Sequence, residues 1–97
     1  MATVNVYRYD FYVPQGFQVG DERGTSFGPW TWFGKAAVWT VQPFSLSTAT
    51  RTLEITHVRA RTVPGEPAGK EYVHVYVRNL GPDPVYIWYL FLGVIAP

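Results

Sequence analysis

Apolar and polar residues alternate along most of the chain with the period of two that is typical of extended strands. Apolar residues spaced three and four positions apart, which would indicate an amphipathic helix, do not recur, and β-branched and aromatic residues are abundant. The pattern predicts five strands, joined by one long loop and three short turns. The strands are expected at 2–13, 35–48, 51–63, 70–80 and 84–95, and the long loop at 14–34.

Two segments rich in proline and glycine predict hairpins between the last three strands. The segment "TVPGEPAGK" (62–70) joins the third strand to the fourth, and "NLGPDPV" (79–85) joins the fourth to the fifth. Proline restricts φ and glycine allows a positive φ, which is the combination that tight turns use. Short turns of this kind between two strands favour antiparallel pairing.

The first three strands each change hydrophobic phase partway. The changes lie between Val6 and Tyr7, across Pro43, and across His57. Each change requires a β-bulge or a strand that passes from one layer to another. We therefore predict one all-β domain over residues 1–97: a small antiparallel β-sandwich, immunoglobulin-like or a partly closed barrel, with about five main strands.

The last strand, "VYIWYLFLGVI" (85–95), is apolar on both faces. It is expected to be central in its sheet and to pack part of its outer surface against a second copy of the chain. Charged residues make up 15% of the sequence, against about 25% in typical soluble domains, so they are too few to cover an isolated monomer evenly. These two features predict a homo-oligomer, with Tyr86, Trp88 and Phe91 as the self-association residues.

The segment "VHVYVRNLGPDPVYI" (73–87) contains the spaced pattern V-x-V-x-N-x-G-x-x-x-V. The pattern positions are Val75, Val77, Asn79, Gly81 and Val85. Residues 73–90 therefore resemble the hairpin of immunoglobulin-like bacterial adhesion domains and CARDB-type sandwiches. The resemblance implies a sandwich fold, and it assigns no functional residue.

The predicted long loop contains the aromatic segment "GPWTWFG" (28–34) and the polar segment "GDERGTS" (20–26). Three of its phenylalanines are expected to cover one end of the core: Phe17, Phe27 and Phe33. Trp30 and Trp32 would share one face of an extended segment, and saccharide sites combine such an aromatic face with a few polar groups. The main hypothesis is a non-enzymatic, lectin-like carbohydrate-binding module whose ligand-binding residues are Trp30, Trp32, Asp21, Glu22 and Arg23.

Two other functions stay open at this point. A structural, self-assembling subunit with no small-molecule ligand explains the excess of aromatic residues equally well. A membrane-surface-binding protein would insert Trp30, Trp32 and Phe33 at the lipid interface, although only Arg23 and Lys35 supply positive charge nearby. The expected partners are a glycan and a second copy of the chain.

No constellation in the sequence indicates catalysis, a metal site or a cofactor. Cysteine is absent, and the serines lack a recognisable triad context. The third and fourth strands are expected to pair so that opposite charges face each other: Glu54 opposite Arg78, and Arg61 opposite Glu71. This register places His57 opposite Val75 and away from His74, so we expect neither a metal site nor an enzyme.

Charge and hydropathy restrict the remaining classes. The net charge is +1 with no basic stripe, which argues against a nucleic-acid partner. The segment "MATVNVYRYD" does not have the pattern of a secretory signal, and the longest apolar run, 85–96, is shorter than the roughly 20 residues of a membrane-spanning helix. We expect a soluble, cytoplasmic protein, with export by an unmarked route left open.

Overall fold

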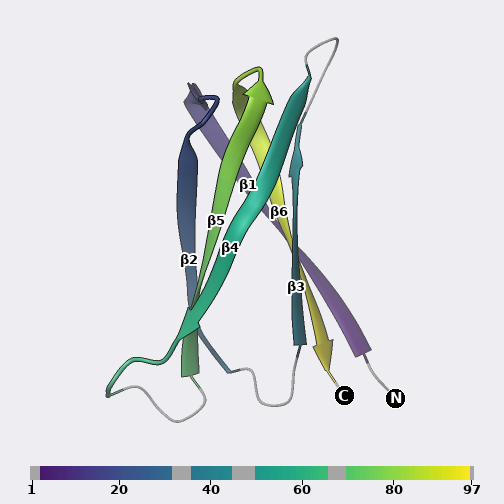
Figure 1. Cartoon of the computed structure of the whole chain (residues 1–97). Coiled ribbons are helices and arrows are strands. Elements are labelled where there is room, and N and C mark those ends of the chain that lie inside the picture. The colour runs from purple at the N-terminus through teal and green to yellow at the C-terminus, as the bar shows by residue number, and fades with distance from the viewer. Residues whose placement is uncertain (1–2, 32–35, 45–49, 66–69, 97) are drawn as a thin grey trace.

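The computed structural model describes residues 3–31, 36–44, 50–65 and 70–96, and it confirms the all-β sandwich. Two three-stranded antiparallel sheets pack together (Figure 1). Sheet 1 has the strand order β1-β6-β3, and sheet 2 has the order β2-β5-β4. The strands in this part of the chain are β1 (Thr3–Phe17), β2 (Glu22–Thr31), β3 (Ala36–Pro43), β4 (Arg51–Arg61), β5 (Lys70–Pro82) and β6 (Val85–Ala96).

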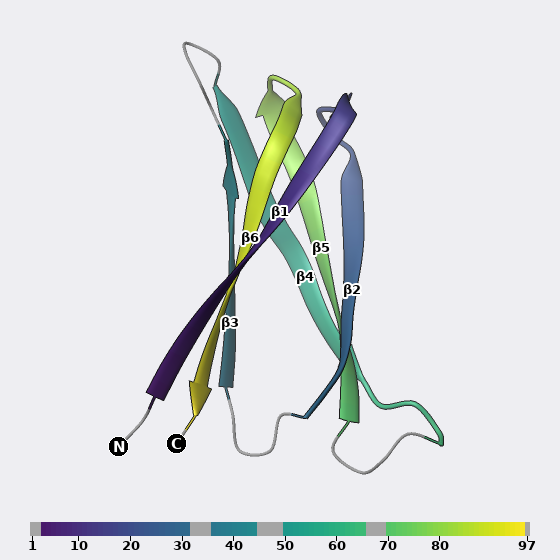
Figure 2. The ribbon, with the colours of Figure 1, turned by 180° about the vertical axis from the view of Figure 1, so that it is seen from behind.

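The two sheets lie close together at one end of the sandwich and diverge at the other (Figures 1 and 2). They meet where β1 leads into β2 and β5 leads into β6, and we call this the closed end. They diverge where β2 and β4 finish and β3 and β5 begin, and we call this the open end. The molecule is therefore a splayed sandwich rather than a closed barrel.

β2 lies within the segment that the sequence predicts as a loop, so that prediction was wrong, and the described chain has six strands rather than five. β2 pairs with β5 and places Gly24 opposite Tyr76. A Cβ atom at Gly24 would lie 2.8 Å from Cε1 of Tyr76, so the glycine makes room for the tyrosine ring. A glycine that indicated irregular backbone in the sequence instead belongs to a cross-strand pair, where two chains approach closely.

The phase change predicted in β4 is confirmed as a β-bulge. Ile55 pairs with Val77 and His57 pairs with Tyr76, which leaves Thr56 as the extra residue. Before the bulge the odd-numbered residues of β4 face the core, and after it the even-numbered residues do. The bulge therefore sets every cross-strand partner in the second half of β4.

The phase change predicted after Val6 is not a bulge. β1 pairs with β6 without interruption from Thr3 to Tyr12. Val4 and Val6 instead lie on the outer face of sheet 1, where they are 61% and 68% exposed. β3 also pairs with β6 continuously as far as Pro43, and most of its predicted extension beyond that residue lies outside the described part of the chain.

One of the two predicted hairpins is confirmed, because β4 and β5 are antiparallel neighbours in sheet 2. The other prediction was wrong: β5 and β6 belong to different sheets, and their short connection crosses between the layers. Asn79, which is fully buried, holds this corner. Its Nδ2 donates to the backbone oxygens of Phe17 (2.8 Å) and Asp83 (3.1 Å), and its Oδ1 accepts from the Gly81 N–H (2.7 Å).

The core lies between the sheets, and β6 is the central strand of sheet 1, as predicted. Alternate residues of β5 and β6 face inward and are almost fully buried. The buried apolar side chains are Phe17, Val73, Val75, Val77, Val85, Trp88, Leu90 and Leu92. The prediction that Phe17 and Phe27 join the core is confirmed, since Phe27 packs against this cluster.

Candidate functional site

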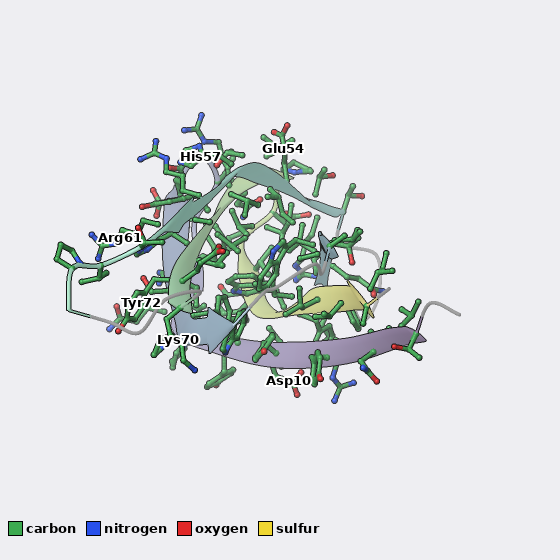
Figure 3. All side chains as sticks on the ribbon, turned by 90° about the horizontal axis from the view of Figure 1, so that it is seen from below. Asp10, Glu54, His57, Arg61, Lys70 and Tyr72 are labelled. Atoms are coloured by element: carbon green, nitrogen blue, oxygen red, sulfur yellow. The ribbon has the colours of Figure 1, made fainter. Side chains whose placement is uncertain are left out.

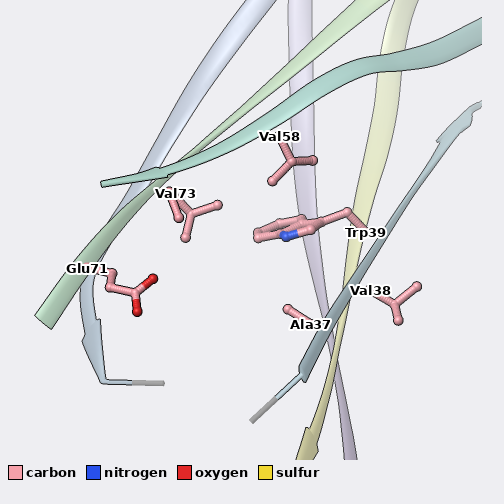
Figure 4. A pocket seen from close by; sticks show the side chains of 7 residues that line it. Ala37, Val38, Trp39, Val58, Glu71 and Val73 are labelled. Atoms are coloured by element: carbon pink, nitrogen blue, oxygen red, sulfur yellow. The ribbon is translucent and has the colours of Figure 1, made fainter. Parts of the chain in front are cut away.

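The open end of the sandwich holds a pocket of about 560 Å³ between the two sheets (Figure 4). Its lining comes from β3 of sheet 1 and from β4 and β5 of sheet 2: Ala37, Val38, Trp39, Val58, Ala60, Glu71 and Val73. The pocket forms because the sheets diverge here and the lining includes small side chains such as Ala37 and Ala60. Its volume is within the roughly 300–1,000 Å³ of small-molecule sites.

Trp39 forms one wall of this pocket. It lies on the inner face of β3, opposite Leu92 of β6, and its indole projects across the gap (Figure 4). Two other rings support it: the Trp30 indole is 6.3 Å away and inclined by only 13°, and the Phe27 ring is 5.2 Å away. These contacts fix the orientation of Trp39, which a stacking platform for a ligand requires.

Trp30 reaches the inner face of sheet 2 because β2 contains a bulge. Phe27 pairs with Val73 and Trp30 pairs with Glu71, so the register shifts by one residue between them. Gly28 lies in this bulge with a φ of 121°, and a Cβ atom there would be 2.6 Å from the backbone oxygen of Glu71. Glycine therefore permits both the backbone conformation and the close approach that bring Trp30 inward.

Glu71 supplies the charged group of the pocket. It continues the inward-facing row of β5 beyond Val73, it is half-buried, and its carboxylate points into the pocket (Figure 4). In the described part of the chain its side chain makes no hydrogen bond or ion pair. The predicted pairing with Arg61 was wrong, because the bulge at Thr56 places Arg61 opposite Tyr72.

Two strand edges border the pocket and add backbone hydrogen-bonding groups. β3 is the last strand of sheet 1, and β4 is the last strand of sheet 2. Each of them therefore has N–H and C=O groups on one side that pair with no described strand. The pocket thus combines an aromatic face, one carboxylate, and backbone groups that both donate and accept.

Tyr9 of β1 extends the row of supporting rings, with its ring centroid 4.7 Å from that of Phe27. Burial raises the pKa of Tyr9 above its ordinary value of 10.0, and the neighbouring Tyr7 raises it further. The Tyr9 hydroxyl is therefore neutral at physiological pH and keeps its proton for hydrogen bonding.

The structure does not assemble the site that the sequence predicts. Three polar residues of that site lie at the closed end of the sandwich: Asp21, Glu22 and Arg23. Trp30 lies near the open end of β2, roughly 20–26 Å from them along an extended strand. Trp32 and Phe33 lie outside the described part of the chain, so their predicted roles are not addressed by the structure.

Two of these polar residues have contacts of their own at the closed end. Glu22 forms an ion pair with Arg78 at 3.3 Å on the outer face of sheet 2. Arg78 also lies opposite Glu54 on β4, so this part of the predicted register is confirmed. The Arg23 guanidinium lies over the Phe17 ring, 5.3 Å from its centroid. These contacts give Glu22 and Arg23 structural roles away from the pocket.

The residues predicted for self-association separate between the two faces of β6. Trp88 is 2% exposed and faces the core, where it stacks on Phe11, so its assignment to a subunit contact is corrected. Phe91 lies on the outer face of sheet 1, opposite Arg8. Tyr86 is 45% exposed. Only Phe91 and Tyr86 are thus placed where a second chain can reach them.

The two histidines do not face each other. His57 lies opposite Tyr76 rather than the predicted Val75, because of the bulge in β4, and His74 lies opposite Arg59. Within the residues that the structure describes, no group of three or more histidine, aspartate or glutamate side chains is placed to hold a metal ion.

One polar contact was missed at the sequence level: Ser26 Oγ lies 2.7 Å from His74 Nδ1. The two residues are cross-strand partners on β2 and β5, a relation that only the register reveals. A serine nucleophile needs a base that a third group orients, together with donors for the oxyanion. No carboxylate hydrogen-bonds to His74 in the described chain, and the pair lies on an exposed sheet face, so we assign it no catalytic role.

Comparisons with models of known protein families, with curated proteins and with solved structures give no match. In the described part of the chain, no helix is long and apolar enough to cross a membrane.

Proposed function

We propose that the protein is a non-enzymatic, lectin-like module that binds a saccharide in the pocket at the open end. The observation that carries the proposal is that the Trp39 indole and the Glu71 carboxylate face the same pocket from opposite sheets. The class of function is the one that the sequence favours. The proposed binding residues differ from the predicted ones. Trp39 and Glu71 line the pocket, whereas Asp21, Glu22 and Arg23 lie at the closed end.

The chemistry of a sugar ring matches this lining. One face of a pyranose consists largely of C–H groups, which pack on an aromatic ring. Its hydroxyls are both donors and acceptors: Glu71 accepts hydrogen bonds, and the edges of β3 and β4 supply donors and further acceptors. Apolar area supplies affinity and a few polar groups fix the orientation, as in small-molecule sites generally.

Among the described residues Glu71 has no hydrogen-bond or ion-pair partner, and this supports the same conclusion. A half-buried carboxylate is normally paired or hydrogen-bonded, yet the described chain offers Glu71 neither kind of partner. The rest of the pocket lining is apolar and includes Val58, Ala60 and Val73. A ligand with hydroxyl groups would satisfy the carboxylate and displace water from that surface.

The first experiment is a glycan array, followed by titration of the best saccharide with tryptophan fluorescence as the readout. Wild-type protein should bind and change its emission, since Trp39 is in the pocket. Glu71→Gln keeps the shape of the side chain and removes its charge, and it should weaken binding about 10-fold or more, as expected for a lost hydrogen bond to a charged group. Glu54→Gln, on an exposed face of β4, is the matched control and should bind like wild type.

Two results would contradict the proposal. A silent array with folded protein rejects saccharide binding as the function. Binding that survives Glu71→Gln but is lost in Asp21→Asn rejects the pocket and places the ligand at the closed end. Circular dichroism of each variant establishes that the fold is kept.

A further inference from the structure

The outer face of sheet 1 is apolar toward the open end of the molecule. The register aligns two rows of residues across β1, β6 and β3: Val6, Gly93 and Val38 in one row, and Val4, Ile95 and Ala36 in the next. Val6, Val4 and Val38 are 68%, 61% and 52% exposed. Phe91 and Tyr89 continue the same face toward the closed end. We call this surface the outer face of sheet 1.

The charges of this surface cancel locally. Arg8 and Asp10 are its charged side chains in the described part of the chain, and they form an ion pair of 2.9 Å. The opposite surface of the sandwich has a typical solvated composition, with charged residues that include Glu22, Glu54, Arg59, Arg61 and Arg78. Figure 3 shows Glu54 and His57 on that side and Asp10 on the other. The sandwich thus has one charged outer face and one that is mostly apolar.

Gly93 lies at the centre of the apolar rows, and the monomer does not explain it. A Cβ atom there would meet only the backbone oxygen of Val38, at an ordinary 3.9 Å, so a larger residue would fit. Glycine inside a strand weakens it and often marks a place where another backbone or a ligand approaches closely. Gly93 lies between Val6 and Val38 in its row and places no side chain between these two exposed valines.

We propose that the outer face of sheet 1 packs on the same face of a second copy of the chain and forms a symmetric dimer. Three observations favour a second copy over other occupants. The face is mostly apolar, as the inner faces of packed sheets are. Its net charge is zero, so two copies do not repel each other, and Arg8 of one copy can approach Asp10 of the other. A membrane surface would instead favour basic residues around the patch.

The size of the face suits a reversible dimer. Three strands about 4.8 Å apart, paired over the eight residues from Trp88 to Ile95, offer roughly 400–500 Å² per copy, or roughly 1,000 Å² in total. That area is at the lower limit of specific interfaces. We therefore expect a dissociation constant on the order of micromolar rather than a permanent dimer.

This inference does not depend on the proposed saccharide site. Trp39 faces the inner side of sheet 1, and the Val38 side chain points away from the pocket (Figure 4). A dimer through the outer face therefore leaves both pockets open. If both proposals hold, two linked sites would bind a multivalent glycan more tightly than one site does.

The test is sedimentation velocity of the full chain across about 1–200 µM, a range that brackets the expected dissociation constant. Wild-type protein should shift from monomer to dimer. Val6→Glu and Gly93→Glu should each raise the dissociation constant at least 10-fold, because each places a charge at the centre of the interface. Leu80→Glu introduces the same charge at an exposed apolar residue of β5, 50% exposed, and should dimerise like wild type.

Several results would overturn the dimer. One is a wild-type monomer throughout the range, and another is a dimer that Val6→Glu leaves unchanged. Because Val6 is largely exposed, this variant keeps the test valid even if Gly93→Glu does not fold. A monomeric wild type that floats with phosphatidylcholine vesicles, while Val6→Glu does not, would assign the face to a membrane instead.

Discussion

At the scale of single residues, Asn79 has the clearest structural role. It is fully buried, and its side chain makes three hydrogen bonds at the corner between β5 and β6. Its backbone also bonds to Gly20 and Asp21 in the turn between β1 and β2. One residue therefore ties the turn between β1 and β2 to the connection between β5 and β6.

Replacing Asn79 with alanine should destabilise the protein by about 2–4 kcal/mol, because it leaves buried backbone groups without partners. Among these groups are the Phe17 oxygen and the Gly81 N–H. Equilibrium urea unfolding measures the change. Asn5→Ala, at an exposed position of β1, is the control and should change stability by less than about 0.5 kcal/mol. Equal stability of the two variants would contradict the role of Asn79.

At the scale of elements, bulges decide which side chains meet. The bulge at Gly28 turns Trp30 toward Trp39, and the bulge at Thr56 moves Arg61 away from Glu71. A one-residue shift moves a side chain to the other face of a sheet, because successive residues of a strand point in opposite directions. The composition of the pocket is thus a consequence of two local irregularities.

Gly28→Ala should destabilise the protein by at least about 1 kcal/mol more than Gly65→Ala, as overpacking at a rigid contact does. Both glycines have a positive φ, but only at Gly28 would the added Cβ collide with backbone, at 2.6 Å from the Glu71 oxygen. At Gly65 nothing lies within 4 Å. Thermal and urea unfolding of the two variants isolate the steric contribution. Similar losses in both would mean that β2 can retreat from β5 at this point.

At the scale of the whole molecule, the open end makes the sandwich less compact than its length suggests. The radius of gyration is 15.3 Å, against roughly 12–13 Å for a compact domain of this size. Long strands and diverging sheets leave more apolar surface exposed than a compact sandwich would. A partner that covers one face is a direct way to bury part of that surface.

If the outer face of sheet 1 forms the dimer, the thermal midpoint of wild-type protein should rise by roughly 3–5 °C for each tenfold increase in concentration. The rise follows from mass action, because only the folded chain dimerises. Differential scanning calorimetry measures it. Val6→Glu, at a largely exposed position, should unfold at a midpoint that depends much less on concentration. A wild-type midpoint that depends on concentration as little as that of this variant would speak against dimerisation.

The sequence predicted part of the pocket and missed the rest for identifiable reasons. The aromatic residues close to Trp30 in the sequence mark it as a candidate binding residue. In the structure Trp30 packs against Trp39, which forms one wall of the pocket. The predicted pairing of Glu71 with Arg61 requires a uniform register along β4, and the bulge at Thr56 breaks that register. Trp39 falls within the predicted strand 35–48, and no local pattern marks a residue that lines a gap between sheets.

The sequence by itself determined the fold class, the position of most strands and the phase change in β4. Alternation, β-propensity and turn residues are local properties, so they can be read along the chain. The tertiary structure alone decided that the β5–β6 connection crosses between sheets and that β2 forms within a glycine-rich segment. It also decided that Trp39 meets Glu71. These outcomes depend on contacts between residues far apart in the chain, whose energies no local pattern contains.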